Sequence, residues 1–114
     1  MFSRNGCYRK TPKLRVRPVP EMDACIVFTP ARPNLYTLNP TAWLVLELCD
    51  GATGKALEAR YYHAVEPLLT RGEARAELHR IVEDLEHKGI VEQFNGSDSQ
   101  ARRRILSAPS NGRV

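Results

Sequence analysis

Apolar and polar residues alternate along the first third of the chain in a pattern that predicts strands. Residues 13–17 (KLRVR) alternate basic with apolar side chains, as a half-buried strand does. Residues 23–29 (DACIVFT) and 34–38 (NLYTL) are rich in residues that favour strands. Pro18 and Pro20 are expected to end the first strand, because proline cannot donate to a ladder. Because strands that are close in sequence usually pair, we expect a three-stranded antiparallel sheet.

After this region the apolar residues recur at the spacing of a helix. Asn39 is a favourable N-cap, and Pro40 a favourable first helical residue because its missing N–H needs no partner there. The apolar run that follows predicts a short buried helix that ends at Asp50 and Gly51. A second helix is expected to begin with Thr53 as its N-cap.

The third predicted helix has the clearest local signal. Thr70 and Glu73 match a capping box at its start, and Gly89 is suited to cap its end. Its apolar face consists of Ala74, Leu78, Ile81, Val82 and Leu85. Residues 90–94 (IVEQF) predict a brief last strand. Three strands followed by three helices in one short unit indicate the α+β class, with a winged-helix-like architecture.

The charged residues divide the chain into three parts. Residues 1–17 hold six bases and no acid, residues 95–114 have a net charge of +3, and residues 18–94 have a net charge of −5. We interpret residues 1–12 as a flexible basic arm and residues 13–94 as the folded domain. Residues 95–114 have no hydrophobic periodicity, and we interpret them as a disordered basic tail.

Side chains that could do chemistry do not form a recognised motif. The three cysteines are odd in number and far apart, which favours reduced thiols in a cytoplasm over disulfides. His79, Glu83 and His87 share one helix face, but that face is opposite the apolar one, so we interpret it as polar surface. No phosphate-binding loop, nucleophile elbow, zinc-protease motif or membrane-length apolar run is present. We expect no catalytic residues, no metal, no cofactor and no membrane span.

The basic ends leave nucleic-acid binding open as an alternative function. A winged helix commonly reads DNA with its third helix, yet residues 73–88 have a net charge of −2, which would repel phosphates. Residues 102–104 (RRR) are the best candidates for contact with nucleic acid, which would be nonspecific. A third possibility is a structural subunit whose groove is filled by a protein partner.

The stretch LNPTAWLVLELCDG, residues 38–51, resembles the signature of the PqqD family. The likeness extends over roughly residues 12–93, through PKLRVR and IVFTP upstream and EDLEHKGIVE downstream. The chain departs from the family in a shorter turn after Gly51, a longer segment at 61–70 and its basic ends. The positions that match the central signature are Leu38, Asn39, Thr41, Ala42, Leu48, Cys49, Asp50 and Gly51.

The resemblance implies a RiPP recognition element, a winged-helix-like module that binds the leader of a ribosomally synthesised precursor peptide. It also implies delivery of that peptide to a modifying enzyme, often a radical S-adenosylmethionine protein. The peptide would lie as an added strand on the third strand, in the groove that this strand makes with the third helix. The expected peptide-binding residues are Asn34, Leu35, Tyr36, Thr37 and Leu38 on the strand, and Arg75, Leu78, Ile81, Val82 and Leu85 on the helix. The flank of the helix that faces the groove stays open, as does the choice between monomer and homodimer.

Overall fold

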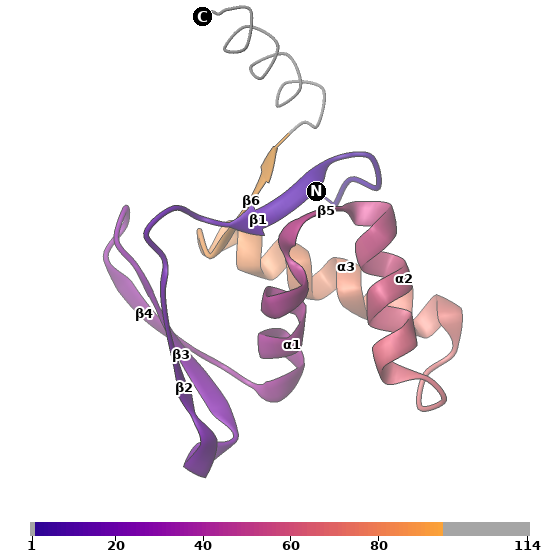
Figure 1. The fold of residues 1–114 in the computed structure, drawn as a ribbon, viewed down its shortest axis with the longest axis horizontal. Coiled ribbons are helices and arrows are strands. Elements are labelled where there is room, and N and C mark those ends of the chain that lie inside the picture. The colour runs from indigo at the N-terminus through magenta and orange to yellow at the C-terminus, as the bar shows by residue number, and fades with distance from the viewer. Residues whose placement is uncertain (1, 95–114) are drawn as a thin grey trace, which may run out of the picture.

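The computed structural model describes residues 2–94, so the predicted tail lies outside the described residues. Its strands are β1 (Cys7–Lys10), β2 (Arg15–Val19), β3 (Ala24–Thr29), β4 (Asn34–Leu38), β5 (Asp50–Thr53) and β6 (Val91–Phe94). Its helices are η1 (Pro20–Met22, a short 3-10 helix), α1 (Pro40–Leu48), α2 (Gly54–Val65) and α3 (Arg71–His87). Figure 1 shows the strands β2, β3 and β4 on one side of the helices, and β1 and β6 across their upper end. The predicted α+β, winged-helix-like class is confirmed.

The first sheet is the predicted three-stranded antiparallel one, in the order β2-β3-β4. Strand β2 continues past Pro18 and ends at Val19, directly before Pro20, so the prediction that Pro20 ends this strand is confirmed and the prediction for Pro18 is wrong. Proline is tolerated there because β2 is an edge strand, and an outward N–H at that position would have no partner in the ladder.

A second antiparallel sheet, in the order β5-β1-β6, goes beyond the sequence-based expectation. Its central strand β1 lies within the segment interpreted as a flexible arm, and its Tyr8 side chain is 0% exposed. The Tyr8 hydroxyl donates to Gln93 at 3.1 Å and accepts the N–H of Ser3 at 2.7 Å. The interpretation of residues 1–12 as a flexible arm is therefore wrong for residues 7–10. All four residues pair with β6, Cys7 and Arg9 also pair with β5, and Tyr8 belongs to the core.

The helices begin at the predicted caps. Asn39 accepts a hydrogen bond from the N–H of its third following residue, and so does Thr53. Both hydrogen bonds of the capping box between Thr70 and Glu73 are present. Helix α1 ends earlier than predicted, because Asp50 and the residues after it pair with β1 as strand β5.

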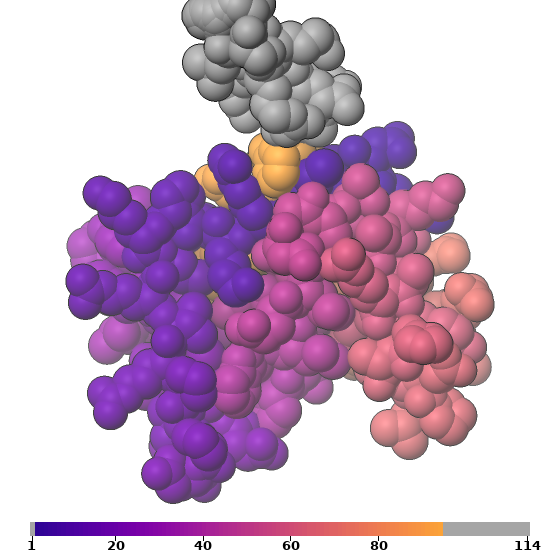
Figure 2. All heavy atoms as spheres, in the orientation of Figure 1, coloured from indigo at the N-terminus to yellow at the C-terminus, as the bar shows by residue number. Residues whose placement is uncertain are grey.

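One core lies between the inner face of the first sheet, the three helices and β1. Its largest fully buried side chains include Tyr8, Tyr61, Leu46, Leu57, Leu78, Leu85 and Ile90. Figure 2 shows the N-terminal third of the chain (indigo to purple) packed directly against the part that follows it (magenta to pink) on the face turned to the viewer. Of the described helices, none has the length and apolar character needed to cross a membrane.

Candidate functional site

Strand β4 is a free edge of the first sheet, since among residues 2–94 it pairs with β3 alone. The register decides which of its backbone groups face outward. Pro18 of β2 is paired with Cys25 of β3, and proline has no N–H to exchange across the pair. Cys25 must therefore direct its backbone groups away from β2, toward its partner Leu38 in β4.

The alternation along an antiparallel ladder then assigns the remaining residues of β4. Tyr36 and Leu38 bond to β3, whereas Leu35 and Thr37 direct their N–H and C=O groups away from the sheet. The hydrogen bonds agree, because the N–H of Leu35 donates to the side chain of Asn34 at 2.9 Å and not to β3. No described residue supplies a backbone partner from outside the sheet for the N–H of Thr37. The edge thus offers two outward positions, at Leu35 and at Thr37.

The side chains of β4 divide between the two faces of the sheet. Leu38 is 3% exposed and faces the core, where the half-buried Tyr36 also packs. Leu35 lies on the opposite face and is 65% exposed. Asn34 and Thr37 are exposed as well. Leu35 is therefore the exposed large apolar side chain of β4 that a polypeptide laid along this edge could contact.

The predicted apolar residues of α3 lie in the core. Leu78, Val82 and Leu85 are each 0% exposed, and Ile81 is 7% exposed. Their burial packs α3 against α1, α2 and β6. Of the four, Ile81 alone reaches the surface.

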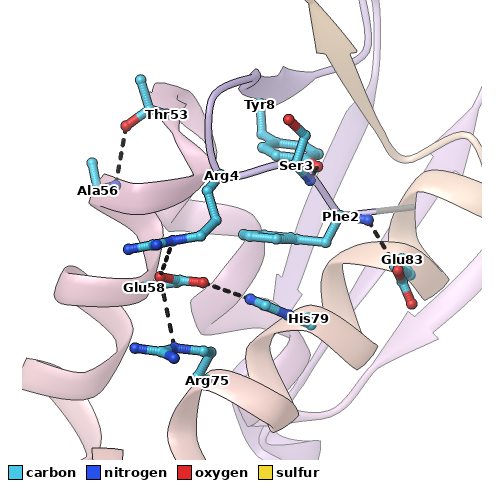
Figure 3. Close-up of polar contacts among 10 residues, drawn as sticks. All are labelled: Phe2, Ser3, Arg4, Tyr8, Thr53, Ala56, Glu58, Arg75, His79 and Glu83. Atoms are coloured by element: carbon cyan, nitrogen blue, oxygen red, sulfur yellow. Dashed lines mark hydrogen bonds and ion pairs between the residues drawn. The ribbon is translucent and has the colours of Figure 1, made fainter. Parts of the chain in front are cut away.

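The structure does not bring Arg75 to β4. Its guanidinium points to α2, where Nε lies 3.8 Å from the Glu58 carboxylate (Figure 3). The flank of α3 that faces β4 instead carries Asp84 and Lys88. Lys88 Nζ lies 5.4 Å from the centroid of the Tyr36 ring and forms an ion pair with Asp84 at 2.9 Å. Sequence periodicity left this choice of flank open, because both flanks border the apolar face equally.

A pocket of about 780 Å³ opens where the turn after β3 approaches the end of α3. We name it the hairpin pocket; residues 11–13, residues 29–32, the C-terminal end of α3 and strand β6 line it. Arg32 from the turn donates to the carbonyl oxygen of His87 at 3.1 Å, which ties the turn to the helix. Lys88 also lines this pocket, so the pocket shares this residue with the contact to Tyr36 of β4.

A buried carboxylate on α2 organises the N-terminal segment (Figure 3). The Glu58 side chain is 8% exposed, accepts a hydrogen bond from Arg4 Nε at 3.0 Å and lies 2.6 Å from His79 Nε2. The ring of Phe2 stacks on His79 with centroids 4.0 Å apart, and the Phe2 N–H donates to Glu83. The interpretation of His79 as part of a solvated helix face is therefore wrong. No group of three or more metal-ligating side chains occurs within the described part of the chain.

Two of the three thiols are structural. Burial raises the pKa of the Cys49 thiol to about 12, and it also raises the pKa of Cys25. Both thiols therefore stay protonated at neutral pH, and a protonated thiol is a poor nucleophile.

Comparison with known proteins identifies the family. A family model described as "Coenzyme PQQ synthesis protein D (PqqD)" matches residues 24–91, more than half of the 114-residue chain. The chain belongs to the PqqD family. No curated protein and no solved structure gave a match. Membership implies a non-catalytic protein that interacts with a precursor peptide and with a modifying enzyme.

The PqqD match begins at β3 and ends in β6. It therefore includes β4, the three helices α1, α2 and α3, and the contact between Tyr36 and Lys88. Strands β1 and β2 lie outside it. The β4 edge and the contact between Tyr36 and Lys88 thus come from the part of the chain that matches PqqD proteins, whereas residues 11–13 of the hairpin pocket lie outside it.

Proposed function

We propose that this PqqD-family protein binds the leader segment of a ribosomally synthesised precursor peptide as an added strand on β4. It then presents the peptide to a modifying enzyme, which we propose to be a radical S-adenosylmethionine protein. The single observation that carries the proposal is the outward direction of the backbone groups of Leu35 and Thr37 on a free sheet edge. The three free cysteines are consistent with action in a reducing cytoplasm.

The strength of strand addition alone is modest. Each backbone hydrogen bond contributes about 0.5–1.5 kcal/mol net. Ordering a disordered peptide costs about 2–5 kcal/mol or more of the gross interaction energy. The bonds available at Leu35 and Thr37 therefore do little more than offset that cost. Side-chain contacts must supply the remaining affinity, and the exposed Leu35 side chain and the contact between Tyr36 and Lys88 are the nearest sources.

In this proposal the predicted site residues have different roles. Asn34, Leu35 and Thr37 contact the peptide directly, and the side chain of Asn34 releases the N–H of Leu35 when the peptide carbonyl replaces it. The buried residues of α3 anchor that helix in the core, and Lys88 at its end reaches Tyr36 of β4. Arg75 takes no part in this contact, because it is directed to α2.

Substitution of Thr37 by proline tests the proposal. Thr37→Pro removes one outward N–H and leaves the ladder between β3 and β4 intact, so a leader that binds by strand addition should lose its affinity. The natural Pro18 on the opposite edge shows that this sheet accepts proline at an outward-facing position. The leaders of short precursors encoded beside this gene are the ligands to titrate, with binding measured by calorimetry.

The matched control is Thr37→Val, which removes the hydroxyl but keeps the N–H and should bind as the unmodified protein does. Equal affinity of the proline and valine variants would refute strand addition on β4. Binding of duplex DNA that weakens steeply with salt, without any peptide affinity, would support the nucleic-acid alternative instead.

A further inference from the structure

We propose that the hairpin pocket binds an acidic side chain of the peptide that lies on β4. The precursors recognised by this protein would then carry an Asp or Glu at a fixed distance from the segment that forms the added strand. This inference rests on the proposed function and adds the chemistry of a second contact to it.

The position of the pocket makes it reachable from the β4 edge. Lys88 takes part in both places, since its Nζ lies over the Tyr36 ring and the residue also lines the pocket. Strand β4 begins at Asn34, next to the turn after β3, and residues 30–32 of that turn form one wall together with Thr29. A peptide that pairs with Leu35 and continues past the start of β4 therefore arrives at the pocket.

The charges on the wall favour an anion. The charged side chains that line the pocket are Lys13, Arg32, Lys88, Glu86 and Glu92. Two of the five are already paired within the protein, Lys88 with Asp84 at 2.9 Å and Glu92 with Arg9 at 2.6 Å. No ion pair to another described residue compensates the remaining three, and two of those three are cations. The uncompensated charge of the wall is therefore positive.

Arg32 has the geometry to bind a carboxylate. One of its N–H groups donates to the carbonyl oxygen of His87, which holds the guanidinium at the mouth of the pocket. Its other N–H groups have no hydrogen-bond acceptor among the described residues. A guanidinium can bind a carboxylate through two parallel hydrogen bonds, which favours Asp or Glu over a neutral side chain.

A peptide-display library tests the proposal directly, since it does not require the natural precursor. Random 12-residue peptides are selected on the full-length protein, and the clones that lose binding to Thr37→Pro are kept as those that use β4. We expect an Asp or Glu at one fixed position among these clones. Replacing that residue in a synthetic clone by Asn or Gln should weaken binding about tenfold, as expected when a charge-assisted hydrogen bond is lost.

Substitutions of the residues that line the hairpin pocket test whether the acidic side chain binds there. Lys13→Glu combined with Arg32→Glu should weaken the acidic clone and remove the difference between its acidic and amide forms. Arg32→Gln keeps a donor for the His87 carbonyl, so it should show the same trend with the turn left in place. The control is Lys55→Glu combined with Arg71→Glu, the same change in charge at exposed residues that do not line this pocket.

The results of the selection distinguish failure of the pocket inference from failure of strand addition on β4. Clones that need Thr37 but show no acidic preference, or that keep their preference in the Lys13 and Arg32 variants, overturn the pocket inference and leave strand addition standing. A selection in which no clone depends on Thr37 refutes the proposed function itself. Circular dichroism of each variant verifies that it is folded before its binding is compared.

Discussion

Lys88 at the end of α3 lies over the aromatic ring of Tyr36 in β4, with Nζ 5.4 Å from the ring centroid. This contact joins the helix to the edge strand of the first sheet. It shows how α3 is oriented in the fold: the flank with Asp84 and Lys88 is turned toward β4, and Arg75 and His79 lie on the side of α2.

The contact between Lys88 and Tyr36 should couple the two residues energetically. In a double-mutant cycle with Lys88→Gln and Tyr36→Leu, we expect an interaction free energy of about 0.5–1 kcal/mol, typical of an exposed cation–π pair. Urea unfolding of the four proteins measures it. A cycle with Lys55→Gln in place of Lys88→Gln should be additive within about 0.5 kcal/mol, because distant sites do not couple. Additivity in both cycles would contradict the contact.

Tyr8 should be essential to stability although it lies close to the N-terminus. Tyr8→Ala removes a fully buried ring, and such truncations cost about 3–5 kcal/mol in the free energy of unfolding. Asn5→Ala, at an exposed position in the same segment, should change it by less than about 0.5 kcal/mol. Chemical denaturation compares the two. If both substitutions changed the free energy of unfolding by the same small amount, β1 would not belong to the folded unit in solution.

The capping box of α3 should make stability depend on pH. Hydrogen bonds from Thr70, chiefly its backbone N–H, lower the pKa of Glu73 in the folded protein. A carboxylate with a lowered folded pKa stabilises the fold above its unfolded pKa of about 4.3, and that contribution is lost as the pH falls through the folded value. Glu73→Gln should therefore lower the unfolding midpoint at neutral pH and have no effect well below the folded pKa. The exposed Glu47→Gln should be silent at both pH values. If Glu73→Gln lowered the unfolding midpoint equally at both pH values, the Glu73 carboxylate would not be the source of the pH dependence.

The three thiols should differ in reactivity. Cys25 and Cys49 are 0% and 1% exposed, and burial raises the pKa of both, whereas Cys7 is half-buried. With iodoacetamide under native conditions we expect Cys7 to be alkylated first and the other two only after unfolding. Mass spectrometry of the digested protein measures the extent of alkylation at each cysteine. The same reaction in urea should label all three cysteines. Native labelling of Cys49 at the rate of Cys7 would show that the core opens locally.

Local chemistry explains why the helices and the first sheet could be predicted. The caps at Asn39, Thr53 and Thr70 each satisfy an N–H only a few residues away, so the residues that form them are adjacent in the sequence. The strands of the first sheet are joined by short connections and carry a clear pattern of apolar residues. The family match over residues 24–91 confirms the resemblance found in residues 38–51.

The second sheet could not be predicted in the same way. Of its strands only β6 was predicted, from the apolar run at residues 90–94. Strands β1 and β5 have four residues each, too few for a periodic signal, and the three strands come from near the N-terminus, the middle and the end of the described chain. Their pairing depends on contacts between residues far apart in sequence, such as Cys7 with Phe94. Only the structure shows that the ring of Tyr8 is buried and that this segment is folded.

By itself, the sequence determined the class of the fold, the starts of the helices, the strand β4 and the likeness to PqqD proteins, because each depends on residues within a few positions of one another. Tertiary structure decided the rest: which flank of α3 meets β4, that Arg75 and His79 turn to Glu58, and that a pocket opens beside Arg32. These features arise where elements distant in the chain pack together. Side-chain volume and charge then select one arrangement among several that the same local patterns allow.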